Sequence, residues 1–258
     1  MNDLSPAPGT ARVWWLGQGG FVFEGPNSGP LVVDPYLSNA CSKGPGSGSD
    51  RLFPVPVSPG DLRYAALFLT HDHKDHTDPE TLPPLVAANP NAAIYAPPAS
   101  VAHLARLGIA GDTVHPVGRN ETIQGAGWHV HTVHAEHSED SVGLVFVFDD
   151  GPVIYHTADT EYFPEIEAAG AWGVSLLSIC INGRWGNMGI ADAARVTVAI
   201  RPAEVLPMHW GLFAGNTADP DEFARVLAEV GATARPVILA AGHGEHLARR
   251  QGGAAAAA

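Results

Sequence analysis

The sequence predicts a single α/β domain in which two β-sheets pack face to face and helices cover the outer faces. Short β-rich segments alternate with helical patterns, and they fall into two groups that are each accompanied by helices. No Pro/Gly-rich linker separates two independent cores. With 258 residues, 45% of them hydrophobic and 16% charged, the chain is long and apolar enough to bury one large core.

The first group of elements lies in the N-terminal half. Residues 12–24 and 30–34 are rich in β-branched and aromatic side chains and predict a hairpin-like pair of strands. Residues 65–70, AALFLT, form a short continuously apolar run, which is typical of a strand buried on both faces. Asp78 is followed by proline and glutamate, which favours a helix that begins there and runs to about Ala88.

The second group contains the clearest helix, residues 220–230. An acidic pair, Asp219 and Glu222, can cap it, apolar side chains recur at i, i+3, i+4 and i+7, and Gly231 ends it. The other expected helices are residues 100–107 and 190–200. The other expected strands are residues 92–95, 128–135, 142–148, 153–156, 174–181, 205–208 and 236–240.

The chain ends differ from this pattern. We expect a flexible N-terminus over residues 1–10, the folded domain over 11–250 and a disordered Gly/Ala-rich tail over 251–258. No signal-peptide pattern and no stretch of about 18 apolar residues occurs, so a cytoplasmic location is the default. Cys41 and Cys180, the only cysteines, are expected to be free thiols.

Charge and histidine content narrow the class of partner. The net charge of −13 disfavours long nucleic acids and anionic membranes, so a small molecule is the expected partner, and an anionic one needs a local positive site. A homo-oligomer is compatible with this composition. The chain has 13 histidines against 14 lysines and arginines, which points to imidazole chemistry.

One long segment, residues 39–59, has no periodicity and is rich in Gly, Ser and Pro. It exceeds the usual length of a connection between elements. We therefore expect it to be functional or mobile, and a lid over the site is the favoured interpretation.

The strongest chemical signal is the segment His71-Asp72-His73-Lys74-Asp75-His76. Three imidazoles and two carboxylates lie within six residues, directly after a predicted buried strand. Zn²⁺, Mn²⁺ and Fe take such ligands, and residues that alternate along an extended chain can converge on two different ions. The alternative interpretation is an incidental polar loop.

Further metal-ligand side chains follow later predicted strands. His134-Ala135-Glu136-His137 comes after one strand, Asp159 after another and His209 after a third. A single histidine at a strand end is more often a surface or core residue. The recurrence of the same strand-then-ligand pattern favours a metal site.

These motifs carry a resemblance to a known family. The HxHxDH segment, the later histidine, YHTADT and PMHW resemble the metallo-β-lactamase fold. WLGQGGF (15–21), DPYLS (34–38), INGR (181–184) and GNM (186–188) are similar to its L-ascorbate-6-phosphate lactonase-like branch of metal-dependent hydrolases. The resemblance covers residues 12–241 and implies a four-layer αββα sandwich.

The resemblance also implies a binuclear site for two divalent ions, Zn or Mn. One ion is then held by His71, His73 and His137, the second by Asp75, His76 and His209, with Asp159 bridging both. A water or hydroxide would complete the bridge, and Asp75 and Asp159 would orient it for catalysis.

Some assignments remain open at this point. His134 is the alternative to His137 and otherwise belongs near the substrate, and His243 is the rival of His209. Asn182 and Arg184 follow a predicted strand in a Gly-rich turn and are candidates for substrate binding. Arg184 can equally be an ordinary surface residue.

Two close divalent ions favour hydrolysis, because they activate water and stabilise charge on the attacked and leaving oxygens. On the lactonase resemblance, a metal-bridging hydroxide attacks the carbonyl of a lactone or ester, such as a small sugar-phosphate-like anion. A phosphodiesterase acting on a small or lipid phosphodiester is the first alternative. A di-iron redox protein is disfavoured by His73, where that family has an acid, and the full set of ligands disfavours a non-catalytic binding module.

Overall fold

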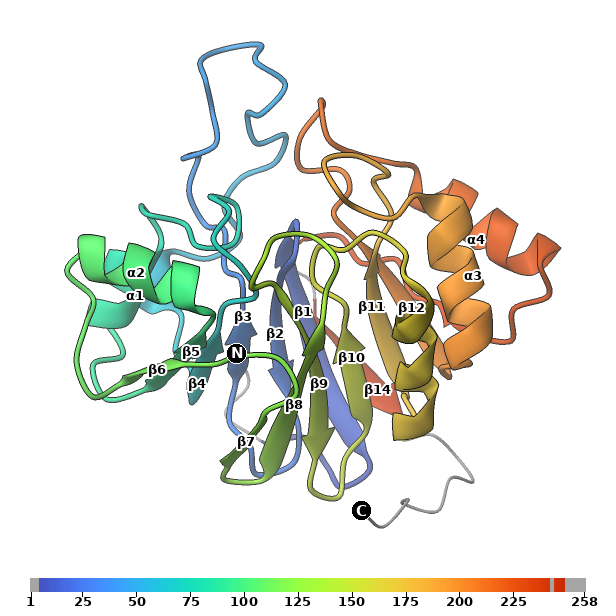
Figure 1. Cartoon of the computed structure of the whole chain (residues 1–258), viewed down its shortest axis with the longest axis horizontal. Helices are drawn as coiled ribbons and strands as arrows, with labels where there is room; N and C mark the ends of the chain where they lie inside the picture. The colour runs from blue at the N-terminus through green and yellow to red at the C-terminus, as the bar shows by residue number, and fades with distance from the viewer. Residues whose placement is uncertain (1–4, 242–243, 249–258) are drawn as a thin grey trace.

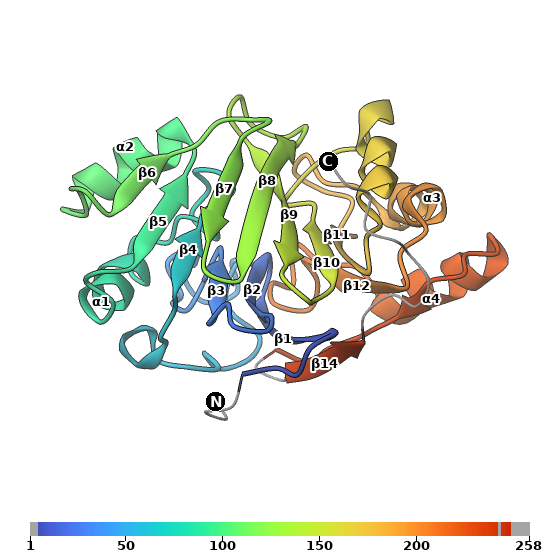
Figure 2. The same ribbon diagram turned by 90° about the horizontal axis from the view of Figure 1, so that it is seen from below.

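Two seven-stranded sheets pack against each other, with helices on both outer sides (Figures 1 and 2). The computed structural model describes residues 5–241 and 244–248. The four-layer α/β sandwich predicted from the sequence is therefore confirmed. None of the helices in the described part of the chain is long and apolar enough to cross a membrane.

The first sheet has the strand order β14-β1-β2-β3-β4-β5-β6. Pairing is antiparallel from β14 to β3 and parallel from β3 to β6. Its strands are β1 (Thr10–Gly17), β2 (Gly20–Glu24), β3 (Leu31–Val33), β4 (Ala66–Phe68), β5 (Ala93–Ala96), β6 (Val114–Pro116) and β14 (Gly244–Ala248).

The second sheet has the strand order β13-β12-β11-β10-β9-β8-β7. Pairing is parallel from β13 to β10 and antiparallel from β10 to β7. Its strands are β7 (Thr122–Gly125), β8 (Trp128–His134), β9 (Val142–Phe148), β10 (Val153–His156), β11 (Leu176–Cys180), β12 (Glu204–Met208) and β13 (Arg235–Pro236).

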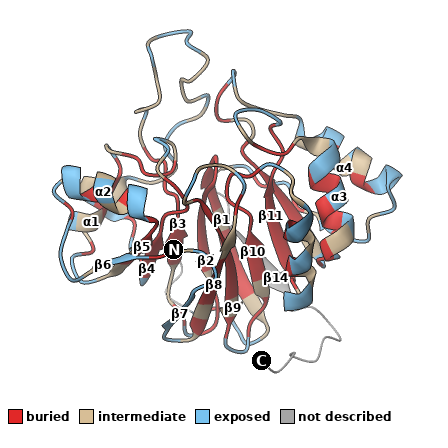
Figure 3. Cartoon of the chain, in the orientation of Figure 1, coloured by how far each residue is buried: buried red, intermediate tan, exposed pale blue. Residues whose placement is uncertain are grey.

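The helices close the outer faces of the sheets. Leucines of α1 (Leu82–Ala87) and α2 (Pro98–Arg106) pack on the first sheet, while α3 (Ile190–Ile200) and α4 (Pro220–Glu229) pack on the second. Two 3₁₀ segments, η1 (Pro59–Asp61) and η2 (Pro164–Trp172), complete the structure. The inner faces of the two sheets share one apolar core, which Figure 3 shows as the most continuously buried part of the molecule.

Strand direction brings the polar loops together. β4 lies parallel to its neighbours β3 and β5, and β10, β11 and β12 are parallel to one another. β8 and β10 are each antiparallel to β9, so they also run the same way. The segments that follow β3, β4, β8, β10 and β12 therefore emerge at one edge of the sandwich, in agreement with the usual location of sites in such folds.

The helix predicted to begin at Asp78 begins four residues later, at Leu82. Asp78 caps a turn instead: its carboxylate accepts hydrogen bonds from the Glu80 backbone N–H (2.9 Å), the Ser38 hydroxyl (2.7 Å) and the Thr81 hydroxyl. This carboxylate thus ties the start of α1 to the segment after β3.

Other differences lie at sheet edges. The strand predicted at residues 236–240 is reduced to Arg235–Pro236, because the chain leaves the sheet after the Val237 N–H donates to the Val205 carbonyl. The edge strands β6 and β7 have mostly exposed side chains and no apolar alternation, so the sequence gives little signal for them.

The predicted chain ends fall partly outside the described residues. The described residues do not include residues 1–4, His243 or the tail 251–258. Thr10 begins β1, and the Gly9 N–H donates to the Asp150 carbonyl at 2.6 Å. Cys41 and Cys180 are both free thiols, as predicted.

Replacing Asp78 with Ala should lower the free energy of unfolding by about 2–3 kcal/mol, because two hydroxyls and one N–H lose their buried acceptor. Urea unfolding followed by circular dichroism measures this. Glu80→Ala, an exposed neighbour, is the matched control and should change stability by less than about 0.5 kcal/mol. Equal effects of the two substitutions would contradict the assigned role.

Candidate metal centre

Six of the histidines and acids that follow these strands converge in two groups. The loop after β4 is coiled by backbone hydrogen bonds from the N–H groups of His76 and Thr77 to the His73 carbonyl. The Thr77 hydroxyl also donates to the His71 carbonyl at 2.9 Å. This coil directs His71 and His73 to one position and Asp75 and His76 to a neighbouring one.

The first group contains His71, His73 and His137, which each offer a nitrogen within 4.8 Å of the others. His71 Nε2 and His137 Nε2 both lie 3.0 Å from His73 Nδ1. His137 comes from the segment after β8, so the group joins the two sheets.

The outer nitrogens of two of these rings face fixed hydrogen-bond acceptors. His137 Nδ1 lies 2.9 Å from the Gly186 carbonyl, which fixes the tautomer of the neutral ring with the hydrogen on Nδ1 and the lone pair on Nε2. The Thr70 hydroxyl donates to Asp34 at 2.5 Å, so it accepts a hydrogen from His71 Nδ1 at 3.0 Å. His71 Nε2 is then also unprotonated.

Two lone pairs therefore point at one atom, His73 Nδ1. A single hydrogen on that atom serves two facing lone pairs poorly, whereas a divalent cation attracts all three nitrogens. The outer contacts to a hydroxyl and a carbonyl are also the kind that orient metal-ligating histidines. This donor set fits a metal ion.

The second group contains Asp75, His76 and His209. Asp75 Oδ2 lies 3.6 Å from His209 Nε2 and 4.0 Å from His76 Nε2. His76 Nδ1 lies 2.7 Å from the carboxylate of Asp34, so its hydrogen bond again points away from the group. The buried Nε2 atom of His76 has no hydrogen-bond partner in the described structure.

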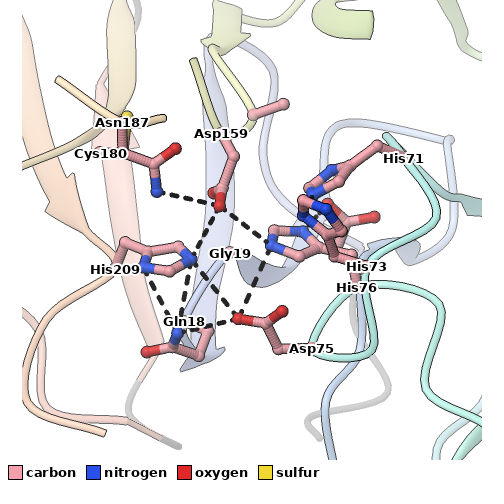
Figure 4. A network of polar contacts seen from close by, with 12 residues as sticks. Gln18, Gly19, His71, His73, Asp75, His76, Asp159, Cys180, Asn187 and His209 are labelled. Atoms are coloured by element: carbon pink, nitrogen blue, oxygen red, sulfur yellow. Dashed lines mark hydrogen bonds and ion pairs between the residues drawn. The ribbon is translucent and has the colours of Figure 1, made fainter. Parts of the chain in front are cut away.

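Asp159 lies between the two groups (Figure 4). Its Oδ2 atom is 3.0 Å from His209 Nε2, 3.5 Å from His76 Nε2 and 3.9 Å from His137 Nε2. Its Oδ1 atom is buried and has no hydrogen-bond partner among the described residues. One carboxylate thus contacts both groups.

Burial favours the neutral form of two histidines of the first group. It lowers the pKa of His71 well below its usual value, and the nearby His76 adds to this effect. Burial, followed by the charge of His137, also lowers the pKa of His73. Both rings are therefore unprotonated at neutral pH, which is the form that binds a metal.

His76 and Asp159 are held in their charged forms. Burial lowers the pKa of His76, but its carboxylate neighbours, Asp159 first, outweigh burial and raise this pKa well above the usual value. Burial raises the pKa of Asp159, and the imidazoles of His209 and His76 outweigh it and hold this pKa well below the usual value. His76 thus carries a proton at neutral pH when nothing else lies at its Nε2.

Asp34, which the sequence reasoning did not single out as a site residue, connects the two groups. Its carboxylate accepts hydrogen bonds from the Thr70 N–H (2.8 Å) and hydroxyl (2.5 Å) and from His76 Nδ1 (2.7 Å). Although Asp34 also lies near His71 in a possible ligand group, these contacts already occupy it. Its position directly after β3 was the available signal.

Gln18 and Gly19, in the turn between β1 and β2, were also not assigned to the site. Gln18 Nε2 donates to Asp75 Oδ2 at 3.1 Å and lies 3.4 Å from the His209 ring nitrogens. A Cβ at Gly19 would lie 2.7 Å from the His76 ring, so the turn has no room for a side chain there.

Three asparagines form a hydrogen-bonded chain that connects Asp159 to the cavity wall. Asn187 Nδ2 donates to Asp159 Oδ2 at 2.9 Å and to Asn182 Oδ1 at 3.1 Å. Asn182 Nδ2 in turn donates to Asn216 Oδ1 at 2.7 Å. Asn182, expected near the substrate, therefore contacts the centre through Asn187.

The other two predicted substrate residues lie elsewhere. Arg184 is exposed, and only its backbone carbonyl takes part in a described hydrogen bond. His134 Nε2 pairs with Glu136 at 2.9 Å, and its ring packs edge-on against Phe163. Neither residue lines the cavity that the two groups open into.

That cavity has a volume of about 480 Å³. Besides His73, Asp75, His137, Asp159 and His209, it is lined by Cys41, Lys43, Ser47, Gly48, Ser49, Lys74, Trp185, Phe213, Gly215 and Asn216.

The long segment 39–59 forms one wall of this cavity and is fastened to the segment after β12. The Gly215 N–H donates to the Gly48 carbonyl at 2.9 Å, and the Leu52 N–H donates to the Leu212 carbonyl at 2.9 Å. Arg51 donates to the Tyr36 carbonyl at 2.8 Å. The segment is the upper blue loop in Figure 1.

A two-sheet α/β sandwich with paired histidine–carboxylate groups at one edge is the architecture of the metallo-β-lactamase fold. The chain belongs to the beta-lactamase superfamily domain family, whose model matches residues 31–210. The narrower resemblance to the lactonase-like branch is not specifically supported by these comparisons.

Curated relatives and solved structures are similar over most of the chain. The "UPF0173 metal-dependent hydrolase" of Cupriavidus metallidurans is 28% identical, over 95% of this chain and 87% of its own. A protein of the same description from Thermoplasma acidophilum is 29% identical, over 85% of this chain and 92% of its own. The metallo hydrolase Igni18 of Ignicoccus hospitalis superposes with a TM-score of 0.74 at 22% identity, covering 93% of this chain and all of that one.

Replacing Asp34 with Asn should weaken metal binding by about 10- to 100-fold, because the carboxylate orients one histidine of each group. Competition with a chromogenic chelator measures the affinity. Asp61→Asn, which removes the same charge at an exposed position, is the control and should bind metal normally. Unchanged affinity in Asp34→Asn would refute the orienting role.

Metal binding at pH 7 should release about one proton from His76, since its pKa is raised in the metal-free protein and a ligand must be unprotonated. Apparent affinity should therefore fall as the pH is lowered. Calorimetric titration in buffers with different ionisation enthalpies measures the release. A heat of binding that does not depend on the buffer would contradict it.

Proposed function

We propose that this protein is a metal-dependent hydrolase with two divalent ions, Zn or Mn. One ion is held by His71, His73 and His137, the other by Asp75, His76 and His209, and Asp159 contacts both. The observation that carries the proposal is that two donor groups share one carboxylate and open into the same cavity. The names of the relatives from Cupriavidus metallidurans and Thermoplasma acidophilum support it.

Two ions in such a site would lower the pKa of water and act as Lewis acids toward the substrate's oxygens. The protein's own groups supply orientation and proton transfer. Asp159 is fixed by Asn187 and His209, so its free Oδ1 atom can hold a nucleophilic water in one orientation. Asp75 is partly exposed to the cavity and can pass a proton to the leaving oxygen.

The substrate class that fits best is a small lactone or ester. The cavity of about 480 Å³ suits a small molecule and is too confined for a long nucleic acid, which the charge of −13 also disfavours. A small phosphodiester is the second candidate, because the same pair of ions would serve it. Its anionic phosphate would face the two lysines of the cavity wall.

Protein purified without chelator should contain about two divalent ions per chain, and Asp159→Asn should lower hydrolysis by at least about a thousandfold with the fold retained. Elemental analysis and circular dichroism measure ion content and fold. Hydrolysis is measured with sugar-phosphate lactones, acyl lactones and small phosphodiesters, each with Zn²⁺ and with Mn²⁺.

Asp192→Asn, at an exposed position of α3, is the matched control and should remain fully active. Full activity in Asp159→Asn, or full activity after complete chelation of the ions, would rule out the proposed chemistry. Cleavage of phosphodiesters alone would exclude the ester and lactone class.

A further inference from the structure

Lysine is used at only two positions of this chain, Lys43 and Lys74. The other 12 of the 14 Lys and Arg residues are arginines. Both lysines line the cavity of the candidate metal centre, and none of the arginines in the described residues does. The whole lysine content of the protein thus lies in the wall of one cavity.

The two lysines come from separate walls. Lys43 lies in the segment 39–59, and Lys74 lies in the loop after β4, between His73 and Asp75. Both are exposed, and within the described ranges neither ammonium group is placed in an ion pair with a carboxylate. Their charges are therefore available to a ligand in the cavity.

Within the described residues, the lining of this cavity has no other charged side chain apart from the proposed metal ligands. Cys41 is neutral, because burial, followed by the charge of Asp75, raises the pKa of its thiol to about 12. The remaining ionisable side chains of the lining are the proposed metal ligands His73, Asp75, His137, Asp159 and His209. Once these are committed to ions, the wall is cationic in a protein whose net charge is −13.

We propose that Lys43 and Lys74 together bind an anionic substituent of the substrate, a phosphate or a carboxylate, and so set specificity for anionic esters or lactones. The inference rests on the proposed hydrolase function. It replaces Arg184 in that role, since the Arg184 side chain lies outside the cavity lining.

The chemistry of lysine suits this task. An ammonium group is a compact charge with three donors on a flexible stem, so two of them can close on an anion from different sides. An anion held between Lys43 and Lys74 would also join the segment 39–59 to the loop that carries His73 and Asp75. The exposed Trp185, 78% accessible, offers an apolar surface for the rest of the substrate.

The first test does not depend on hydrolysis. Metal-loaded protein is treated with pyridoxal 5′-phosphate or with pyridoxal, the imines with lysine are reduced with borohydride, and the labelled residues are identified by peptide mass. Because one lysine can react while the other holds the phosphate, the phosphorylated reagent should label both lysines about three- to tenfold faster. High salt should reduce this advantage.

The variants Lys43→Met and Lys74→Met decide whether the two lysines act together. In each variant, the two reagents should label the remaining lysine at the same rate. In Arg225→Met, which removes one exposed charge on α4, the phosphorylated reagent should still label both lysines faster. Equal labelling by both reagents in the unaltered protein, or an advantage that survives in both lysine variants, would overturn the proposal.

The second test uses 6-phosphoglucono-δ-lactone and glucono-δ-lactone, which differ by one phosphate. Each lysine variant should raise KM for the phosphorylated lactone about three- to tenfold and leave KM for the neutral lactone and kcat for both nearly unchanged. Equal changes for both lactones would overturn the specificity role. If neither lactone is hydrolysed, the labelling result still decides the anion site separately from the hydrolase proposal.

Discussion

The candidate site depends on one buried carboxylate, that of Asp34. It accepts hydrogen bonds from the backbone and hydroxyl of Thr70, at the end of the neighbouring strand, and from His76. A buried carboxylate must have such partners, because the free-energy cost of removing it from water is otherwise several kcal/mol. The need to satisfy this one group therefore fixes the Thr70 hydroxyl and, through it, the orientation of His71. The carboxylate of Asp34 thus orients one histidine of each donor group.

Buried polar groups of the second sheet are satisfied in a similar way. Asn187 donates its amide hydrogens in two directions, to Asp159 and to Asn182, and Asn182 donates onward to Asn216. This chain connects the carboxylate shared by the two groups to a residue of the cavity wall. The segments that carry Asn216 and the glycine-rich loop 39–59 are themselves joined by backbone hydrogen bonds. Cavity shape and carboxylate orientation therefore depend on the same contacts.

Much of the architecture could be predicted from the sequence because its signals are local. Apolar runs in the sequence predict the buried strands, and the histidines and acids directly after these runs predict a site at one edge of the sheets. Gln18 and Asn187 could not be assigned in this way, since each acts on a residue distant in sequence and neither follows a strand as an acid or a histidine. Asp34 has the position of a site residue, but its role depends on the distant Thr70 and His76. The start of α1 was misplaced for a related reason: Asp78 has the residue type of a cap, but Ser38, 40 residues away, competes for its carboxylate.

Backbone conformation adds a final property. Of the nine non-glycine residues with positive φ in the described ranges, five lie at the centre or its cavity: Gln18, Asp34, Ala158, Trp185 and His209. Such conformations cost on the order of 1 kcal/mol each and persist only where the surrounding fold over-determines them. Contacts within the fold therefore maintain the strained backbone at these five positions. An ion that binds there would not have to supply the free energy of these conformations, because the protein's own packing already supplies it.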